Sequence, residues 1–349
     1  MSRLDTKYWV VDKKDEKLTT NPQIQEAALW INKNEVVAFP TETVYGLGAN
    51  ALSDEAIAKI YEAKGRPSDN PLIVHIAKES QLQSLVKSIP ESAEKLMAAF
   101  WPGPLTIIFE SNSTVSSKVT AGLSTVAIRM PDHPVALALI EAAGVPVAAP
   151  SANLSGKPSP TNAEHVLHDL QGRIAGIVDG GPTGVGVEST VIDCTSTPAI
   201  ILRPGGITRE EIEAVIGPVA VDKALTEKGQ APKSPGMKYT HYAPKAPLVI
   251  VLGSNTFMQN LIDKERQSGK KVGVLATEES KQRYKADVIV ACGYREDLKT
   301  VARDLYDSLR AFDKEMVDII FSEGFPRTGL GEAIMNRLEK AAGGHIIKE

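Results

Sequence analysis

The sequence has few of the features that mark secreted, membrane-spanning or zinc-binding proteins. Its 349 residues include only two cysteines, Cys194 and Cys292, which cannot build a disulfide framework. No apolar run is long enough to span a bilayer. The N-terminal residues mix both charge signs, so we expect no signal peptide. No cluster of His, Cys and carboxylates has the spacing of zinc ligands. We therefore expect a cytoplasmic location, because a reducing compartment suits so few cysteines.

The charge balance is also modest. The formal net charge is −4, with 42% hydrophobic and 23% charged residues, which is an ordinary composition for a soluble protein. This charge gives no reason to expect bulk binding of nucleic acid, although a local basic patch remains open. The length favours two domains.

The usual nucleotide-binding and nucleophile signatures are absent or incomplete. The run from Gly46 to Ala51 matches GxGxxA, but the acid that should follow, Asp69, precedes the second strand instead of ending it. Gly156-Lys157 resembles the end of a P-loop without its first glycine. Ser151 lacks the G-x-S-x-G context of a nucleophile. We discount the first two signatures, whereas a Ser-His-Asp triad stays open.

What is present is a stretch of unusual polar content, from residue 39 to residue 76. An apolar run, Val36 to Phe39, leads into a turn rich in Thr and Gly, and a helix follows that ends near Lys64. A second strand, Leu72 to Ile76, carries His75. Two cations, several hydroxyls and an imidazole thus come into one neighbourhood.

Two interpretations of this stretch stay open at the level of residues. Lys64, Gly65 and Pro67 form an ordinary helix stop, Arg66 then being a solvated charge and His75 a core histidine. Alternatively, a Lys and a forked Arg two residues apart hold the oxygens of a polyphosphate.

The remaining pattern predicts two domains and a linker. We expect an α/β domain over residues 1–216 with a mixed, twisted sheet, a linker over 217–246 rich in Pro and Gly, and a smaller domain over 247–349. In the last region strands and helices alternate, which is typical of a Rossmann-like parallel sheet. Expected helices include 22–32, 79–86, 91–100, 134–143, 162–170, 208–216 and 331–341. Expected strands include 8–11, 105–109, 125–129, 145–149, 174–178, 189–193, 199–202, 248–252, 272–276, 288–291 and 317–321.

Polar residues recur at the ends of the expected strands. Ligands of α/β proteins bind beyond strand ends, so these residues can converge, although each by itself also suits an ordinary turn. The set comprises Thr41 to Thr43, Thr125, Arg129, Ser151, Asn153, Ser159, Ser189 and Arg203.

Successive sequence blocks resemble one family. The blocks FPTETVYGLG, KGRPSDNPL, TVAIRMPDHP, APSANLSGKPSPT, GVESTV and LRPGGI are similar to those of the YrdC-like domain. The linker segment SPGMKYTHYAP and the added α/β domain resemble the two-domain form of threonylcarbamoyl-AMP synthase.

The resemblance implies an activity. Such enzymes make threonylcarbamoyl-AMP and diphosphate from L-threonine, bicarbonate and ATP, with Mg²⁺ bound mainly through the phosphates and water. A separate transferase complex then modifies the tRNA adenosine beside the anticodon. Direct contact with tRNA stays open, and no membrane is involved.

The resemblance also implies roles for individual residues. Lys64 and Arg66 would be catalytic, and Tyr239 of the linker would close over the nucleotide. The expected threonine-binding residues are Thr43, His75, Arg129, Ala149 and Ser189. The expected ATP-binding residues are Arg66, Asn70, Thr125, Ser151, Asn153, Ser159, Arg203 and Tyr239. No protein ligand to a metal is expected.

Two alternatives come from other functional classes. The cations at Lys64 and Arg66 could grip the phosphates of double-stranded RNA, which would make RNA affinity steeply dependent on salt. The second sheet could instead serve a Rossmann-type oxidoreductase, which would retain NAD.

Overall fold

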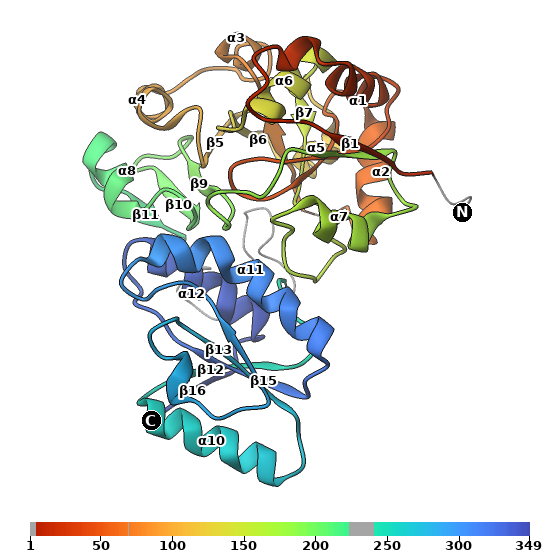
Figure 1. Cartoon of the computed structure of the whole chain (residues 1–349). Coiled ribbons are helices and arrows are strands. Elements are labelled where there is room, and N and C mark those ends of the chain that lie inside the picture. Colours follow the sequence, from red (N-terminus) through yellow and green to blue (C-terminus); the bar gives the residue numbers. More distant parts are fainter. Residues whose placement is uncertain (1–4, 69, 223–240) are drawn as a thin grey trace. The chain divides into compact units, whose positions relative to one another are not determined.

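The computed structural model describes residues 5–68, 70–222 and 241–349. Contacts between residues divide the chain into two compact units (Figure 1). The first unit comprises Met1–Ser155, Pro160–Gly184 and Glu188–Lys238, and the second comprises Gly156–Ser159, Val185–Val187 and Tyr239–Glu349.

The first unit is built on a sheet of 11 strands in the order β1-β8-β2-β3-β7-β4-β6-β5-β9-β10-β11. Parallel and antiparallel neighbours alternate irregularly, since β4 runs parallel to β6 and antiparallel to β7. The predicted mixed sheet is therefore confirmed. The strands are β1 Lys7–Val10, β2 Val37–Phe39, β3 Gly46–Asn50, β4 Ile73–His75, β5 Leu105–Glu110, β6 Thr125–Arg129, β7 Val147–Ala148, β8 Gly176–Asp179, β9 Thr190–Asp193, β10 Ile200–Arg203 and β11 Ala220–Val221. The helices are η1 Leu18–Thr20, α1 Pro22–Asn32, α2 Asp54–Lys64, α3 Glu79–Leu82, α4 Glu91–Phe100, α5 Ser117–Thr120, α6 Pro134–Ala143, α7 Ala163–Leu170 and α8 Arg209–Ile216.

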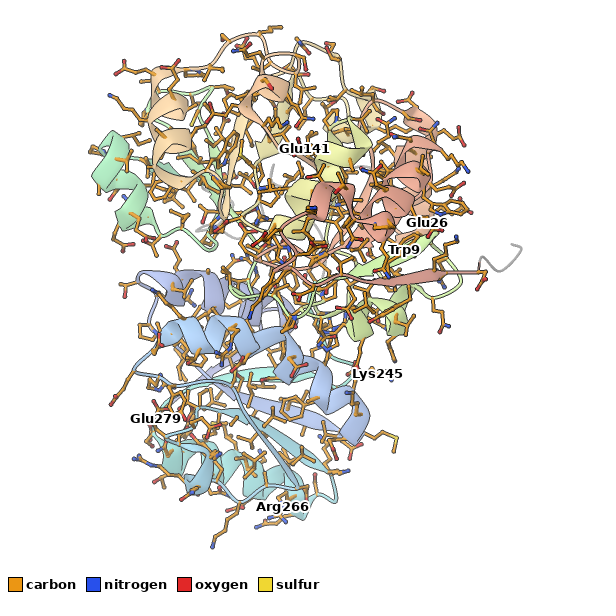
Figure 2. All side chains as sticks on the ribbon, turned by 45° about the horizontal axis from the view of Figure 1, so that its top comes forward. Trp9, Glu26, Glu141, Lys245, Arg266 and Glu279 are labelled. Carbon is orange, nitrogen blue, oxygen red and sulfur yellow. The ribbon has the colours of Figure 1, made fainter. Side chains whose placement is uncertain are left out.

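Helix starts follow the capping signals of the sequence. The Asn21 side chain accepts from the backbone N–H groups at the start of α1, and Pro22 occupies the first helical position. Thr208 and Glu211 form a reciprocal capping box on α8. In the same unit the Trp9 indole donates to the carboxylate of Glu26 at 2.9 Å, a pair labelled in Figure 2.

Two local predictions are wrong. The helix expected over 79–86 ends at Leu82, because the chain around Val86 instead forms a bridge with Ser111. The Thr- and Gly-rich turn is shorter than expected, because Gly46–Asn50 forms the buried strand β3. A Cβ on Gly48 would lie 2.6 Å from the Phe39 ring and 2.8 Å from Val147, so glycine lets these strands pack closely.

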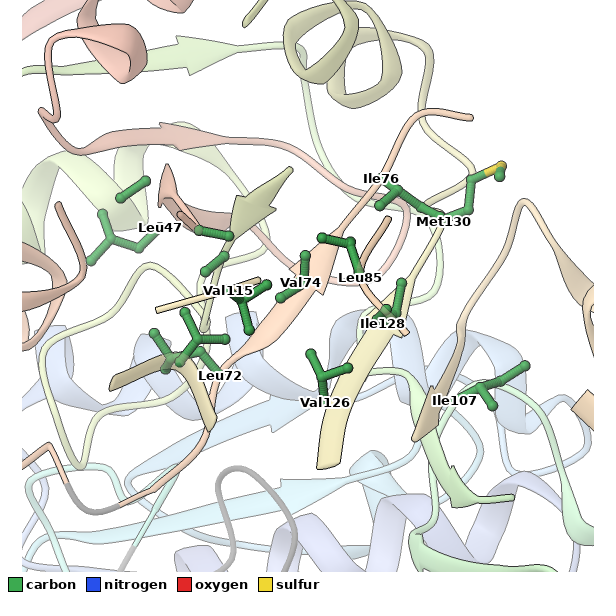
Figure 3. Close-up of a cluster of buried hydrophobic side chains, with 14 of the residues drawn as sticks. Leu47, Leu72, Val74, Ile76, Leu85, Ile107, Val115, Val126, Ile128 and Met130 are labelled. Atoms are coloured by element: carbon green, nitrogen blue, oxygen red, sulfur yellow. The ribbon is translucent and has the colours of Figure 1, made fainter. Parts of the chain in front are cut away.

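Alternation along the strands gives the sheet two different faces. On β4, Val74 joins the large hydrophobic core, together with Leu72 before it and Ile76 after it (Figure 3). Ile73 points the other way, into a small apolar cluster with Ala127. Successive strand residues face opposite sides, so His75 shares the face of Ile73.

The second unit has a five-stranded sheet in the order β14-β13-β15-β12-β16, and all of its strand pairs are parallel. This confirms the expected Rossmann-like sheet. Figure 1 shows α10 on one side of the sheet and α11 with α12 on the other. The elements are β12 Leu248–Leu252, α10 Asn255–Gln267, β13 Val272–Ala276, η2 Lys281–Arg283, β14 Val288–Ala291, α11 Leu298–Glu315, β15 Ile319–Glu323, α12 Leu330–Ala341 and β16 Ile346–Lys348.

The C-terminal strand β16 was not predicted, and β15 begins two residues later than expected. Over the described ranges of both units, the helices lack the length and apolarity needed to cross a bilayer.

Candidate active site

One face of the first sheet carries buried polar residues on β4 and β6, beside apolar residues such as Phe39 of a second hydrophobic core. Thr125, Ala127 and Arg129 alternate along β6 and therefore share a face. His75 is the register partner of Arg129 on β4. The two ladder partners place an imidazole beside a guanidinium on a buried surface.

The guanidinium of Arg129 is held at all three nitrogens. Its Nε donates to the Gly103 carbonyl oxygen at 3.2 Å, and its Nη1 donates to the Thr43 hydroxyl at 2.9 Å. Its Nη2 lies 2.6 Å from a carboxylate oxygen of Glu42. The side chain is only 5% exposed, so this cation is fixed in a single orientation away from water.

A tight turn after β2 positions the Thr43 hydroxyl. Thr41 Oγ1 lies 2.9 Å from Thr43 Oγ1 and donates to the Val44 carbonyl oxygen at 2.6 Å. It also accepts from the backbone N–H groups of Thr43 and Val44. The Thr-rich block therefore forms an ST-turn that presents one hydroxyl to Arg129.

His75 is a neutral imidazole at neutral pH. Burial, together with the neighbouring Arg129 charge, lowers the pKa of its side chain to about 3. Its Nδ1 lies 3.2 Å from the Ile73 carbonyl oxygen, and its ring packs edge-on against Phe39. The contact with a carbonyl oxygen suits a proton on Nδ1 and leaves Nε2 as an acceptor.

Lys64 ends α2 with its ammonium group turned into the protein. Its Nζ donates to the carbonyl oxygens of Ser151 at 2.5 Å and Asn153 at 2.7 Å. Burial lowers the pKa of Lys64 well below its usual value, and the Arg66 charge lowers it further, while Asp169 raises it. The charged form of Lys64 thus depends on nearby negative charge.

The loop after β7 is tied down by its own side chains as well. The Ser151 hydroxyl donates to Asn153 Oδ1 at 2.6 Å, and Asn153 Nδ2 donates to the Leu154 carbonyl oxygen at 2.8 Å. Arg66 and Asn70, which follow Lys64 in the same sequence block, are both buried. Cations and amides therefore gather where the sequence predicted a polyphosphate site.

A third group joins the strands β5, β9 and β10. The Ser189 hydroxyl lies 2.7 Å from the Thr106 hydroxyl, and Arg203 Nη2 donates to the Ser189 carbonyl oxygen at 2.9 Å and hydroxyl at 3.1 Å. All three residues are buried.

The structure thus brings together three subsets of the predicted residues: Thr43, His75 and Arg129; Lys64, Ser151 and Asn153; Ser189 and Arg203. Thr125 lies four positions from Arg129 on the same strand face, about 13 Å away at the usual rise of a strand.

The remaining predicted residues are placed less directly. The backbone N–H of Ala149 donates to the Ile73 carbonyl oxygen at 2.9 Å, next to His75. Ser159 is buried and belongs to a short segment of the second unit. Tyr239 lies outside the described residues.

Sequence reasoning assigned no role to Glu42 or Thr106, although both contact predicted site residues. Glu42 lies inside the Thr41 to Thr43 strand end, and its position between two site threonines was the available signal. Thr106 is one polar residue in a β-rich run, and only the strand pairing reveals that it reaches Ser189.

The second unit has a hollow of about 490 Å³ at the carboxyl ends of its strands. The buried carboxylate of Glu323 accepts from the Tyr284 hydroxyl at 2.8 Å, the Thr277 backbone N–H at 3.1 Å and Arg295 at 3.1 Å. This carboxylate is thus bonded within the protein. The ring centroids of Tyr242 and Tyr306 lie 5.1 Å apart, so Tyr242 packs within this unit.

Comparisons with known proteins match both parts of the chain. Residues 30–205 match the family named Sua5_yciO_yrdC and described as telomere recombination, and residues 207–343 match the C-terminal domain of threonylcarbamoyl-AMP synthase. The threonylcarbamoyl-AMP synthase of Bacillus subtilis is 63% identical over 99% of this chain and 100% of its own length. That of Pyrococcus abyssi is 51% identical over 93% of this chain and 96% of its own length.

Solved structures agree. The crystal structure of P. abyssi Sua5 complexed with L-threonine aligns with a TM-score of 0.92 at 49% identity, over 99% of this chain and 100% of that one. Both sequence and structure therefore extend the match over the two units. The chain belongs to the threonylcarbamoyl-AMP synthase family and has the two-domain architecture of that family.

Proposed function

We propose that this protein makes threonylcarbamoyl-AMP and diphosphate from L-threonine, bicarbonate and ATP. The observation that carries the proposal is the 63% sequence identity to a threonylcarbamoyl-AMP synthase over 99% of this chain. The buried contact between Arg129 and Thr43 supports it. The two alternatives from the sequence, an RNA-binding module and an oxidoreductase, receive no support from these relatives.

The threonine subsite is proposed around Arg129. A planar guanidinium suits a carboxylate, and the Thr43 hydroxyl and neutral His75 suit a substrate hydroxyl. Ser189 and the Ala149 backbone complete this set. The surrounding strands hold these groups in place before substrate arrives, which limits the ordering cost of binding.

The ATP subsite is proposed around Lys64 and Arg66, with Asn70, Thr125, Asn153 and Arg203 as further contacts. Polyphosphate beside Lys64 would raise its lowered pKa and so favour the charged ammonium form. Ser151 and Ser159 would contribute hydroxyls, and Tyr239 is proposed to cover the nucleotide.

The proposed reaction has two steps. The threonine amine is first carboxylated to a carbamate, with loss of water and a proton overall. A carbamate oxygen then attacks the α-phosphorus of ATP, and the bond to the bridging oxygen breaks to release diphosphate. Because both steps use substrate atoms as nucleophiles, the protein contributes positioning and charge stabilisation.

Magnesium is proposed to accompany ATP through its phosphates and water. The product would pass to a tRNA threonylcarbamoyltransferase complex, and we propose a cytoplasmic location for both.

The test is the release of diphosphate from ATP by the full-length protein. We expect release to require threonine and bicarbonate together, and mass spectrometry to detect the mixed anhydride. Release of diphosphate in the absence of threonine or of bicarbonate would contradict the proposal. Salt-dependent binding of double-stranded RNA without such release would favour the RNA-binding alternative.

A further inference from the structure

Glu42 places a carboxylate against the cation of the proposed threonine subsite. One of its oxygens lies 2.6 Å from Arg129 Nη2, and the two side chains are only 12% and 5% exposed. A pair so shielded from water is strongly coupled, and removing one partner leaves the other charge buried. Glu42 is therefore part of the environment in which any carboxylate would meet Arg129.

The contact is a close approach of charges without a hydrogen bond. Both Glu42 carboxyl oxygens and Arg129 Nη2 are buried, and none of the three atoms has a hydrogen-bond partner. The other two nitrogens of Arg129 donate to Gly103 and Thr43, so its orientation does not depend on Glu42. Buried polar atoms without partners are costly, and a ligand that supplied both an acceptor and a donor would satisfy them.

An α-amino acid zwitterion has this pair of groups. Its nitrogen and its carboxylate carbon lie about 2.5 Å apart, since two covalent bonds join them. The buried charges of Glu42 and Arg129 are adjacent in the same way, with opposite signs. A carboxylate alone would bring like charge against Glu42, whereas a zwitterion complements both residues.

We infer that Glu42 binds the α-ammonium group of threonine while Arg129 binds its carboxylate. The inference rests on the proposed function, because it takes threonine as the ligand of this subsite. It assigns Glu42 a direct role in selecting a free amino group, the group that must later be carboxylated. Glu42 is then a binding residue and not only a support for Arg129.

Ligands that lack one charged group distinguish the two possible roles of Glu42, binding of the ammonium group and support of Arg129. Isothermal calorimetry on the full-length protein would compare L-threonine with 2,3-dihydroxybutanoate, which has a hydroxyl in place of the ammonium group, and with L-threoninamide, which keeps the ammonium group without the carboxylate. Each ligand is titrated into the wild type and into Glu42→Gln.

We expect Glu42→Gln to lower the binding affinity for threonine and for threoninamide by roughly ten- to a hundredfold, because the ammonium group of each ligand loses a charged partner. Dihydroxybutanoate should bind the variant at least as well as it binds the wild type. Equal losses for threonine and dihydroxybutanoate, with threoninamide unchanged, would show that Glu42 only orients Arg129. Tighter binding of threonine by the variant would show that Glu42 competes with the substrate carboxylate. Either result overturns the inference.

Two controls protect the comparison. Glu35→Gln removes a carboxylate of the same unit that pairs with Lys59 at 2.9 Å, and should leave all three affinities unchanged. Glu42→Asp keeps the negative charge and should therefore lose less threonine affinity than Glu42→Gln. This comparison of affinities holds even if Glu42→Gln also unfolds at a lower temperature. Threonine-dependent diphosphate release by the wild type is measured separately, so failure of the proposed function is distinguishable from failure of the Glu42 assignment.

Discussion

Lys64 contacts Asn153 twice, with its Nζ 2.7 Å from the carbonyl oxygen and 3.4 Å from Oδ1 of that residue. A lysine expected at the phosphates of ATP therefore also fixes the loop after β7. The two roles can operate together, since an ammonium group that anchors a loop also contributes charge to it.

We predict that Lys64→Ala lowers turnover by about 10²–10³ with a smaller loss of ATP affinity, the usual cost of removing a group that stabilises developing charge. Single-turnover rates at saturating ATP measure this. Lys59→Ala on the same helix, whose ammonium group pairs with Glu35 and Glu55, is the control and should keep its turnover. Normal chemistry with weakened ATP binding would make Lys64 a ground-state anchor.

Arg129→Ala should raise the threonine concentration needed for half-maximal rate by roughly ten- to a hundredfold, and the ATP concentration far less. Losing a charged hydrogen-bond partner has about this effect. Titrating each substrate separately checks the prediction, with the half-exposed Arg209→Ala as the control. A defect confined to ATP would assign Arg129 to the other ligand.

The buried His133 should make stability fall in acid. Burial lowers its pKa to about 4, although Glu42 opposes and Lys13 adds to this effect. Between about pH 6.5 and 4 the unfolded chain binds a proton that the folded chain does not, so stability decreases as the pH falls through this window. The full effect is on the order of 3 kcal/mol.

The variant His133→Gln should therefore lose less unfolding free energy than the wild type between pH 6.5 and 4, by urea titration at each pH. Carboxylates other than Glu42, whose charge acts on His133, contribute equally to both proteins and cancel in the comparison. His345→Gln, at an exposed position, should match the wild type. If the unfolding free energies of the wild type and His133→Gln fall in parallel with pH, His133 is not the source of the acid sensitivity.

Gly48→Ala should destabilise the first unit by about 1–3 kcal/mol, the usual cost of overpacking a core. The new methyl group would lie within 3 Å of both Phe39 and Val147. Denaturant midpoints measure the effect. Gly184→Ala is the matched control, because its new methyl group would have no atom within 4 Å beyond its chain neighbours, among the described residues, and stability should barely change.

Sequence reasoning succeeded where local chemistry decides the structure. The cap at Asn21 and the box of Thr208 with Glu211 set helix starts through bonds within four residues. The bounds of β6 and β12 followed from short β-branched runs. In the site, the family blocks grouped Thr43, His75 and Arg129, which lie together in the structure, while their role as threonine ligands stays a prediction.

The misses depend on distant partners. Gly46–Asn50 has little β propensity and becomes a strand because β2 and β7 pair with it on either side. Glu42 has the pattern of a solvated turn residue until Arg129, which is 87 positions further on, is folded against it. The place of Glu42 between two threonines was a local signal for the residue itself, but no local pattern reports its distant partner.

The strand order of the first sheet also constrains how this chain can be made. β8 lies between β1 and β2, so residues 7–10 and 37–39 cannot complete their pairing until residues 176–179 are present. Pairings so far apart in sequence are slow to form, and open strand edges invite association with other chains. During synthesis, β1 therefore emerges before its partner β8, and β2 emerges with only β3 beside it. The yield in cells should depend on protection of these edges until β8 is translated.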